Sequence, residues 1–214
     1  MFDALLVRRL KKPLECMARP LAARGVSANS LTVIGFAMGL VGAFSIAFDA
    51  MWIALVALAV NRLMDGLDGA VARLSRPTEV GAYLDIVLDF VIYSSVPLAF
   101  AIRDPSDAVA AAFLLFCFMG TGSSFLAFSI FAKAHGWSNA RLKDKSIYYL
   151  EGLTEGFETI LVLALMCLFP EWFSVLAYGF GCLCLITTVS RIRNASIALH
   201  GISGADPDSL SQTK

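Results

Sequence analysis

Six long apolar runs constrain the fold of this chain more than any other feature. They cover roughly residues 31–48, 51–64, 82–102, 108–132, 147–169 and 172–189 of a 214-residue sequence. A hydrocarbon core of about 30 Å is crossed by a helix of about 20 predominantly apolar residues. With 58% hydrophobic and only 16% charged residues, the chain is predicted to be an all-α, polytopic membrane protein with six transmembrane helices.

The second run is short for a membrane span. It reaches an adequate length only if its helix continues through Asp65 toward Arg73. That extension would place the acidic residues of this region near one face of the membrane.

The basic residues are distributed very unevenly among the connections between the runs. Of the 17 Lys and Arg residues, all except Arg103 fall in the N-terminal segment, in or beside the second connection (Arg62, Arg73 and Arg76), in the fourth connection or in the C-terminal tail. Because cytoplasmic loops carry an excess of Lys and Arg, both termini and the acidic residues of the second connection are predicted to be cytoplasmic.

The N-terminal segment carries leucines at helical spacing with basic residues between them. Residues 2–24 are therefore predicted to form an amphipathic helix in the cytoplasmic interface, although a solvated basic arm is the alternative. Gly25 would end this helix, and Ser27 or Asn29 could cap the first span. We expect one membrane domain over residues 1–200, with a six-helix bundle over 29–190, and a disordered tail over 201–214.

Four aspartates lie within these apolar surroundings. Asp65 and Asp68 are three residues apart and Asp85 and Asp89 four apart, so on helices each pair shares one face. Ionisable groups in a membrane are costly and suggest a function. Two divalent cations would neutralise the four carboxylates. The alternative is a set of helix caps, or a structural charge network that nearby arginines neutralise.

The aspartates belong to a longer ordered pattern. It reads D-x-x-D-G-x-x-A-R, seven residues, then G-x-x-x-D-x-x-x-D, with its defining positions at Asp65, Asp68, Gly69, Ala72, Arg73, Gly81, Asp85 and Asp89. This pattern and the six-run layout resemble the CDP-alcohol phosphotransferase (CDP-alcohol phosphatidyltransferase) family. Residues 120–128 and 145–160 resemble a bacterial inner-membrane branch of it, which implies that location and names no acceptor.

The resemblance implies an activity and a set of roles. Such enzymes move a substituted phosphoryl group from a CDP-linked donor, commonly CDP-diacylglycerol, to an alcohol and release CMP, using Mg²⁺ or Mn²⁺. Two ions are expected here. By this resemblance Asp65, Asp68 and Asp85 are metal ligands. Asp89 is the general base and also touches the second metal.

The same resemblance places nucleotide contacts at the start of the first span, where Asn29 and Thr32 stand. The residue types of the motif agree with a phosphate site. Gly69 and Ala72 are small enough for close approach, Arg73 offers a planar charged fork, and Gly81 leaves room for substrate. The two glycines could instead serve close helix packing.

A second acidic stripe opens the fifth run. Glu151, Glu155 and Glu158 lie at i, i+4 and i+7 on one helix face. They either recognise a polyol or amine acceptor or are interfacial and paired with basic side chains. The acceptor alcohol stays open, as does a soluble CDP-alcohol donor with a lipid acceptor.

Other functions and partners follow from the same observations. A divalent-cation transporter and an inactive scaffold are the competing functions for such an acidic cluster. A homodimer is compatible with the small residues of the first run, and no nucleic-acid partner is expected.

Overall fold

The structure, a computed structural model, describes residues 2–75, 77–134, 154 and 156–203. Over these residues it is helical and contains no strand, which confirms the predicted all-α class. The helices are α1 (Phe2–Ala23), α2 (Ala28–Ala47), α3 (Met51–Leu74), α4 (Glu79–Arg103), α5 (Ala108–Ala134), α7 (Gly156–Leu168) and α8 (Phe173–Ser203), with short 3-10 helices η1 (Pro105–Asp107) and η3 (Pro170–Trp172).

Four segments among the described residues are long and apolar enough to cross a membrane. They are α2, α4, α5 with the preceding η1, and α8 with the preceding η3. Helix α3 has 24 residues, but its second half carries the charged residues of the motif. Helix α7 has 13 residues, fewer than a span of about 20 requires. The earlier part of the predicted fifth span lies outside the described residues.

Two helices extend beyond the ends of their apolar runs. Helix α3 continues through the aspartates to Leu74, as expected from its short apolar part. Helix α8 continues to Ser203, well beyond the predicted end of the last span at residue 189. No Pro or Gly interrupts the chain between Val189 and His200, so the helix continues after the apolar run has ended.

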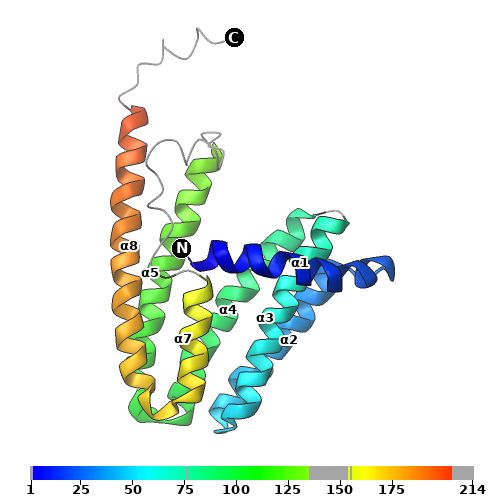
Figure 1. The fold of residues 1–214 in the computed structure, drawn as a ribbon. Coiled ribbons are helices and arrows are strands. Elements are labelled where there is room, and N and C mark those ends of the chain that lie inside the picture. Colours follow the sequence, from blue (N-terminus) through cyan, green and yellow to red (C-terminus); the bar gives the residue numbers. More distant parts are fainter. Residues whose placement is uncertain (1, 76, 135–153, 155, 204–214) are drawn as a thin grey trace. The chain divides into compact units, whose positions relative to one another are not determined.

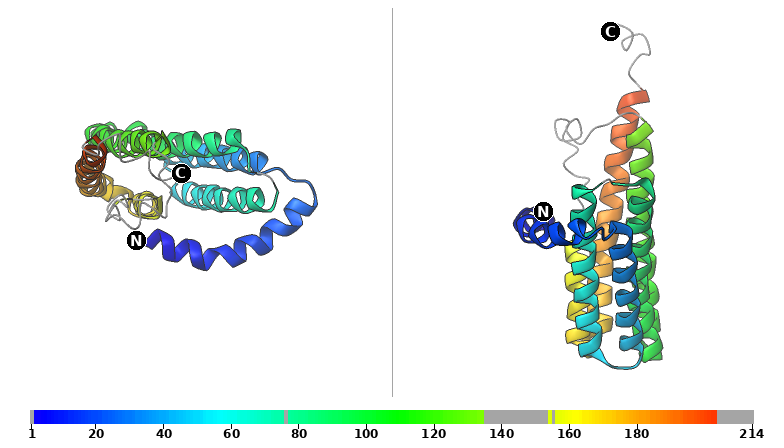
Figure 2. Two further views of the ribbon diagram at one scale, coloured as in Figure 1. Left: turned by 90° about the horizontal axis from the view of Figure 1, so that it is seen from above. Right: turned by 90° about the vertical axis from the view of Figure 1, so that its right-hand side faces the viewer.

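The chain divides into two compact units. The first comprises residues 1–116 and 156–180, and the second residues 117–155 and 181–214. In the first unit α3 contacts α1, α2 and α7, and α2 also contacts α4. Helices α2, α3 and α4 run alongside one another, whereas α1 lies across them (Figure 1). The right-hand view of Figure 2 shows α1 nearly end-on while these three helices stand upright.

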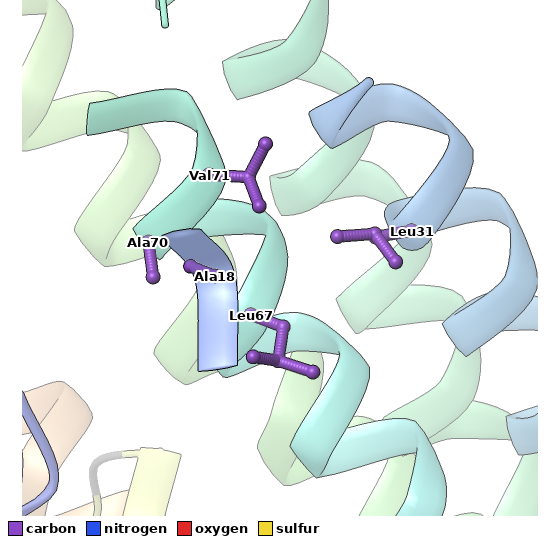
Figure 3. Close-up of a cluster of buried hydrophobic side chains, with 5 residues drawn as sticks. All are labelled: Ala18, Leu31, Leu67, Ala70 and Val71. Atoms are coloured by element: carbon purple, nitrogen blue, oxygen red, sulfur yellow. The ribbon is translucent and has the colours of Figure 1, made fainter. Parts of the chain in front are cut away.

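A small apolar cluster fixes α1 against the part of α3 that carries the motif. It consists of Ala18, Leu31, Leu67, Ala70 and Val71, all buried (Figure 3). Close to it, a Cβ atom at Gly66 would lie 3.1 Å from Leu14 of α1, so the glycine lets the two helices approach. Leu67 and Ala70 flank Asp68 and Gly69 in the chain. Packing of α1 therefore holds the helix segment that bears the acidic motif.

The connections at the opposite end of the first unit are joined by a basic residue. Arg103, at the end of α4, contacts Asp49 between α2 and α3 at 2.6 Å and Glu171 of η3 at 3.5 Å. Near it, the buried rings of Phe100 and Phe173 are stacked with centroids 4.3 Å apart. Three chain connections thus meet at the end of the unit that is remote from the acidic motif.

The second unit buries several polar side chains beside the remainder of α5 and the remainder of α8. Arg191 is buried, donates a 3.1 Å hydrogen bond to the carbonyl of Thr121, and lies 5.6 Å from the Phe125 ring centroid. Thr154 donates to Thr187 at 3.1 Å. Nη1 of Arg191 and the hydroxyls of Thr154 and Thr187 therefore have hydrogen-bond partners within the unit.

Candidate active site

Three local features place the first turns of α2 and α4 beside the motif. Gly25, at a φ of 77°, ends α1 in the left-handed region that favours glycine. Ser27 then caps α2 by accepting a 3.1 Å hydrogen bond from the amide of Ser30, so of the two predicted caps Ser27 is the one used. Thr78 caps α4 in the same way by accepting from the amide of Gly81 at 3.0 Å.

Three of the four aspartates come together between α3 and α4. Asp65, Asp68 and Asp85 each offer a carboxylate oxygen within 4.8 Å of the others. Asp68 is only 5% exposed, so its charge is largely removed from solvent. We call these three residues the acidic cluster. Carboxylates this close repel one another unless a cation or protons neutralise them.

Thr32 connects α2 to the acidic cluster. Its hydroxyl donates a 2.5 Å hydrogen bond to Oδ2 of Asp68, and it also lies 3.1 Å from the carbonyl oxygen of Ala28. Because the threonine is in the second turn of α2, the capped start of that helix orients one carboxylate of the cluster. A predicted nucleotide contact is thus also in direct contact with a predicted metal ligand.

Asp89 lies apart from the acidic cluster and is held by an arginine. Among the described acidic side chains it is not within the 4.8 Å group. Its Oδ1 accepts from Nη2 of Arg62 at 2.5 Å, and its Oδ2 accepts from Nη1 at 3.3 Å. The Tyr93 hydroxyl donates to Oδ2 at 3.1 Å. Both carboxylate oxygens therefore already have hydrogen-bond donors.

The guanidinium of Arg62 is fixed by neighbours on several sides. Its Nε donates to Oδ1 of Asn61 at 2.9 Å, and its Nη1 lies 2.9 Å from the Tyr93 hydroxyl and 3.5 Å from Oδ2 of Asp65. Asn61, itself 4% exposed, donates to the carbonyl of Gly35 on α2 at 2.8 Å. This network links α2, α3 and α4 around the arginine.

The sequence did not single out Asn61, Arg62 or Tyr93. Arg62 was counted among the basic residues that orient the chain in the membrane. Its position three residues before Asp65 is a signal that could have been used, because residues at i and i+3 share a helix face. Tyr93 is likewise four residues after Asp89. The ion pairs of Arg62 with Asp65 and Asp89 correspond in part to the alternative interpretation of the motif, in which nearby arginines neutralise the aspartates.

Two hollows meet at the acidic cluster. A small cavity of about 10 Å³ is lined by all four aspartates, together with Asn61 and residues of α2 and α4. A larger open pocket of about 780 Å³ lies beside it, between the end of α1 and the first turns of α2 and α4. Thr32, Asp68 and Asp85 line both hollows. The acidic cluster therefore opens into the larger pocket.

Most of the predicted nucleotide contacts line the larger pocket. Those that do are Asn29, Thr32, Gly69, Ala72 and Gly81. Arg73 is exposed and is not among the lining residues that the structure describes. A Cβ atom at Gly81 would lie 2.8 Å from Oδ1 of Asn29. The absence of a side chain at this glycine therefore keeps the pocket open between α2 and α4.

The donor atoms of the acidic cluster fit a divalent cation. All are carboxylate oxygens, the ligands that Mg²⁺ and similar hard cations take, and their spacing lets one ion contact all three. The adjacent small cavity has room for about one water molecule. The adjoining pocket leaves space for phosphate oxygens to complete the coordination of such an ion.

The second acidic stripe is only partly within the described residues. Glu158 lies in the first turn of α7. Glu151 and Glu155 lie outside the described residues. Their two interpretations, as acceptor recognition or as paired interfacial charges, stay predictions.

Comparisons of the sequence agree with the motif. Residues 26–190 match the family described as CDP-alcohol phosphatidyltransferase. The chain is 45% identical to the inner membrane protein YnjF of Escherichia coli, over 94% of this chain and 98% of that protein. It is 33% identical to an archaetidylinositol phosphate synthase of Pyrococcus horikoshii, over 44% of this chain and 50% of that protein.

A solved structure shares the fold. The phosphatidylinositol phosphate synthase of Mycobacterium tuberculosis, crystallised with CDP-DAG bound, superposes with a TM-score of 0.66. The match covers 85% of this chain and 92% of the synthase at 21% sequence identity. The arrangement of helices is therefore common to both proteins.

Proposed function

This chain belongs to the CDP-alcohol phosphatidyltransferase family and is a phosphotransferase of phospholipid biosynthesis, and we propose the reaction that it catalyses. It transfers a phosphatidyl group from CDP-diacylglycerol to an alcohol and releases CMP. The observation that carries the proposal is the convergence of Asp65, Asp68 and Asp85 at the edge of a pocket of about 780 Å³. The same pocket is lined by five residues of the family motif, which are Asp68, Gly69, Ala72, Gly81 and Asp85, and by Asn29 and Thr32 at the start of α2.

We assign the metal ligands and the base to the four aspartates. Asp65, Asp68 and Asp85 hold the first divalent ion, Mg²⁺ or Mn²⁺, and Asp89 contributes to a second. Asp89 also accepts the proton of the acceptor hydroxyl. When bound, the ions supply positive charge that stabilises the attacking and leaving oxygens of the transfer. All four carboxylates line one small cavity, which supports a common role.

In the transfer itself, the protein orients the donor and the acceptor and accepts the proton of the acceptor hydroxyl. The deprotonated acceptor oxygen forms a bond to the phosphorus that bears diacylglycerol. The bond from that phosphorus to the bridging oxygen of the diphosphate breaks, and CMP leaves with that oxygen and both bonding electrons. Asp89 retains the acceptor proton until solvent removes it. General-base assistance of this kind contributes typically 10²–10⁴-fold to a rate, by order of magnitude.

The nucleotide part of the donor occupies the larger pocket. Asn29 and Thr32 contribute polar contacts from α2, while Gly69, Ala72 and Gly81 keep the walls close to the backbone. Five of the six proposed contacts line the pocket, which supports this placement. Arg73 is exposed, and we assign it to a donor phosphate at the edge of the pocket.

The membrane arrangement completes the proposal. The chain forms one domain over residues 1–200, with an interfacial helix over 2–24 and six spans over 29–190. Both termini and the acidic cluster face the cytoplasm, at the bacterial inner membrane. The four long apolar helices and the inner-membrane relative support a membrane location. The acyl chains of the donor stay in the bilayer while its diphosphate reaches the acidic cluster.

A divalent-cation transporter is the alternative from another class, and an inactive scaffold is a third. A transport path requires polar residues to continue across the bundle. The buried residues of α2 are instead Leu31, Gly35, Gly39, Gly42, Ala43 and Ile46, and those of α4 are Ile92, Val96, Pro97, Ala99 and Phe100. The apolar buried faces of α2 and α4 therefore favour the enzyme.

One assay tests the proposed function. Purified protein in detergent is incubated with Mg²⁺, radiolabelled CDP-diacylglycerol and a panel of acceptors that includes glycerol phosphate, serine and inositol phosphate. We expect CMP release with at least one acceptor and its loss in Asp65→Asn. Asp104→Asn is the matched control, because Asp104 is an exposed carboxylate just beyond the end of α4. Metal flux into liposomes without CMP release from any donor would overturn the proposal.

A further inference from the structure

The network around Asp89 has a consequence for its proposed role. Oδ1 and Oδ2 of Asp89 both accept hydrogen bonds from Arg62, at 2.5 Å and 3.3 Å, and Oδ2 accepts a third from Tyr93. A carboxylate paired with a guanidinium through both oxygens has few directions left for a metal ion. With three of its roughly four acceptor sites occupied, Asp89 offers a cation an unhindered approach only when one of these bonds opens.

The arginine is placed by its own partners and not by Asp89 alone. Asn61 accepts from Nε, and the ring of Tyr93 lies 5.3 Å from the guanidinium carbon. The Arg62 side chain is 15% exposed, and that of Asp89 is 28% exposed. Because these contacts already order the Arg62 side chain, less conformational entropy is lost when Arg62 pairs with Asp89.

Charge balance leads to the same conclusion. Arg62 supplies one of the positive charges that four neighbouring carboxylates require, and it also lies 3.5 Å from Asp65 of the acidic cluster. With one divalent ion on the acidic cluster, little negative charge is left to attract a second ion while the guanidinium stays in place.

We propose that Arg62 is a positioning residue that holds Asp89 away from the acidic cluster, and that its guanidinium must release Asp89 before this carboxylate can ligate a second divalent cation. The inference rests on the proposed function, because it presupposes that the acidic cluster binds a divalent cation. In the enzyme without substrate, the chain therefore binds one such ion tightly and a second only weakly. Binding of substrate phosphates, which bring further negative charge, favours release.

The experiment measures Mn²⁺ stoichiometry in the absence of substrate. Free Mn²⁺ is titrated into the detergent-purified full chain and followed by electron paramagnetic resonance. We expect one tight ion in the wild type and two in Arg62→Met, with the affinity of the second site increased roughly tenfold to a hundredfold by loss of the charged pair. The double variant Arg62→Met with Asp89→Asn should return to one ion.

Further variants separate a positioning role from a merely structural one. Arg62→Lys keeps the charge and should stay near one ion. Tyr93→Phe removes one donor to Asp89 and should increase second-site affinity by less than Arg62→Met does. Arg103→Met is the matched control, since it removes an arginine ion pair at the opposite end of the unit and should leave the stoichiometry unchanged.

The possible failures are distinguishable. Two equally tight ions in the wild type, or a single ion in both Arg62→Met and Tyr93→Phe, would overturn the positioning role and leave the proposed function intact. No Mn²⁺ bound to folded protein of any variant would contradict the metal site itself, and the proposed function with it.

Discussion

The hydroxyl of Thr32 lies 2.5 Å from Oδ2 of Asp68, and this hydrogen bond joins the first turns of α2 to the acidic motif of α3. Asp68 is buried, so the threonine satisfies a charged group that water reaches poorly. Both residues line the larger pocket and the small cavity. This contact therefore connects the proposed nucleotide site to the proposed metal site.

Thr32→Val should weaken metal binding without preventing folding. The variant keeps the shape of the side chain but removes the donor that orients Asp68. Outer-shell contacts of this kind typically change metal affinity by about 10- to 100-fold, and we expect the lower end of that range. The measurement is Mn²⁺ titration of purified protein. Thr121→Val, which removes a hydroxyl bonded to its own helix backbone in the second unit, should bind Mn²⁺ normally.

Gly81→Ala should reduce donor binding more than it reduces the maximal rate. The new methyl group would lie 2.8 Å from Oδ1 of Asn29 and 3.0 Å from Oγ1 of Thr78, so the wall of the pocket must move. We expect the KM for CDP-diacylglycerol to rise roughly tenfold, as for one misplaced methyl group in a binding site. Gly179→Ala is the control, because nothing lies within 4 Å of its new carbon. An unchanged KM in Gly81→Ala would place the nucleotide elsewhere.

Removal of divalent cations should lower the unfolding temperature of the purified protein. A ligand that binds only the folded state stabilises it by RT ln(1 + [L]/Kd), about 2.7 kcal/mol at a hundredfold excess over Kd. We expect Mg²⁺ to raise the unfolding temperature of the wild type after chelation, and to have little effect on Asp65→Asn. The measurement is thermal unfolding in detergent. Equal stabilisation of both proteins would show that Mg²⁺ acts away from the acidic cluster.

Phe100→Ala should destabilise the first unit without altering its metal site. The ring is fully buried and stacked on that of Phe173, and its loss leaves a cavity at the end of the unit remote from the motif. Deletion of a buried aromatic ring costs about 3–5 kcal/mol. Unfolding in detergent measures the loss, and Mn²⁺ titration of the folded protein checks the site. Phe116→Ala, at a residue 67% exposed, should cost much less.

Much of the site could be predicted because the spacing of the motif residues in the sequence matches the repeat of an α-helix. The spacing of Asp65 from Asp68 fixes a shared face once α3 is known to be a helix. Small residues such as Gly81 and Ala72 indicate close approach by their size alone. The continuation of α3 past the apolar run followed from the length that a span requires.

The pairing of Asp89 with Arg62 could not be predicted with the same certainty. The two residues are on different helices, so their contact depends on the rotation of α4 against α3, which periodicity does not determine. A count of basic residues treats Arg62 as a topology signal whether it faces solvent or the bundle. The end of α8 was also missed, because hydropathy marks where an apolar run stops and not where the helix stops.

The contacts of Arg103 with Asp49 and Glu171, together with the stacked rings beside them, have a mechanical consequence. We expect these contacts to limit the separation of the helices at this end, so that a spreading motion that admits the proposed two-chained donor pivots here. The largest displacement then occurs at the opposite tips of α2 and α4. Spin labels at those tips should report a broad distance distribution that narrows when the donor binds.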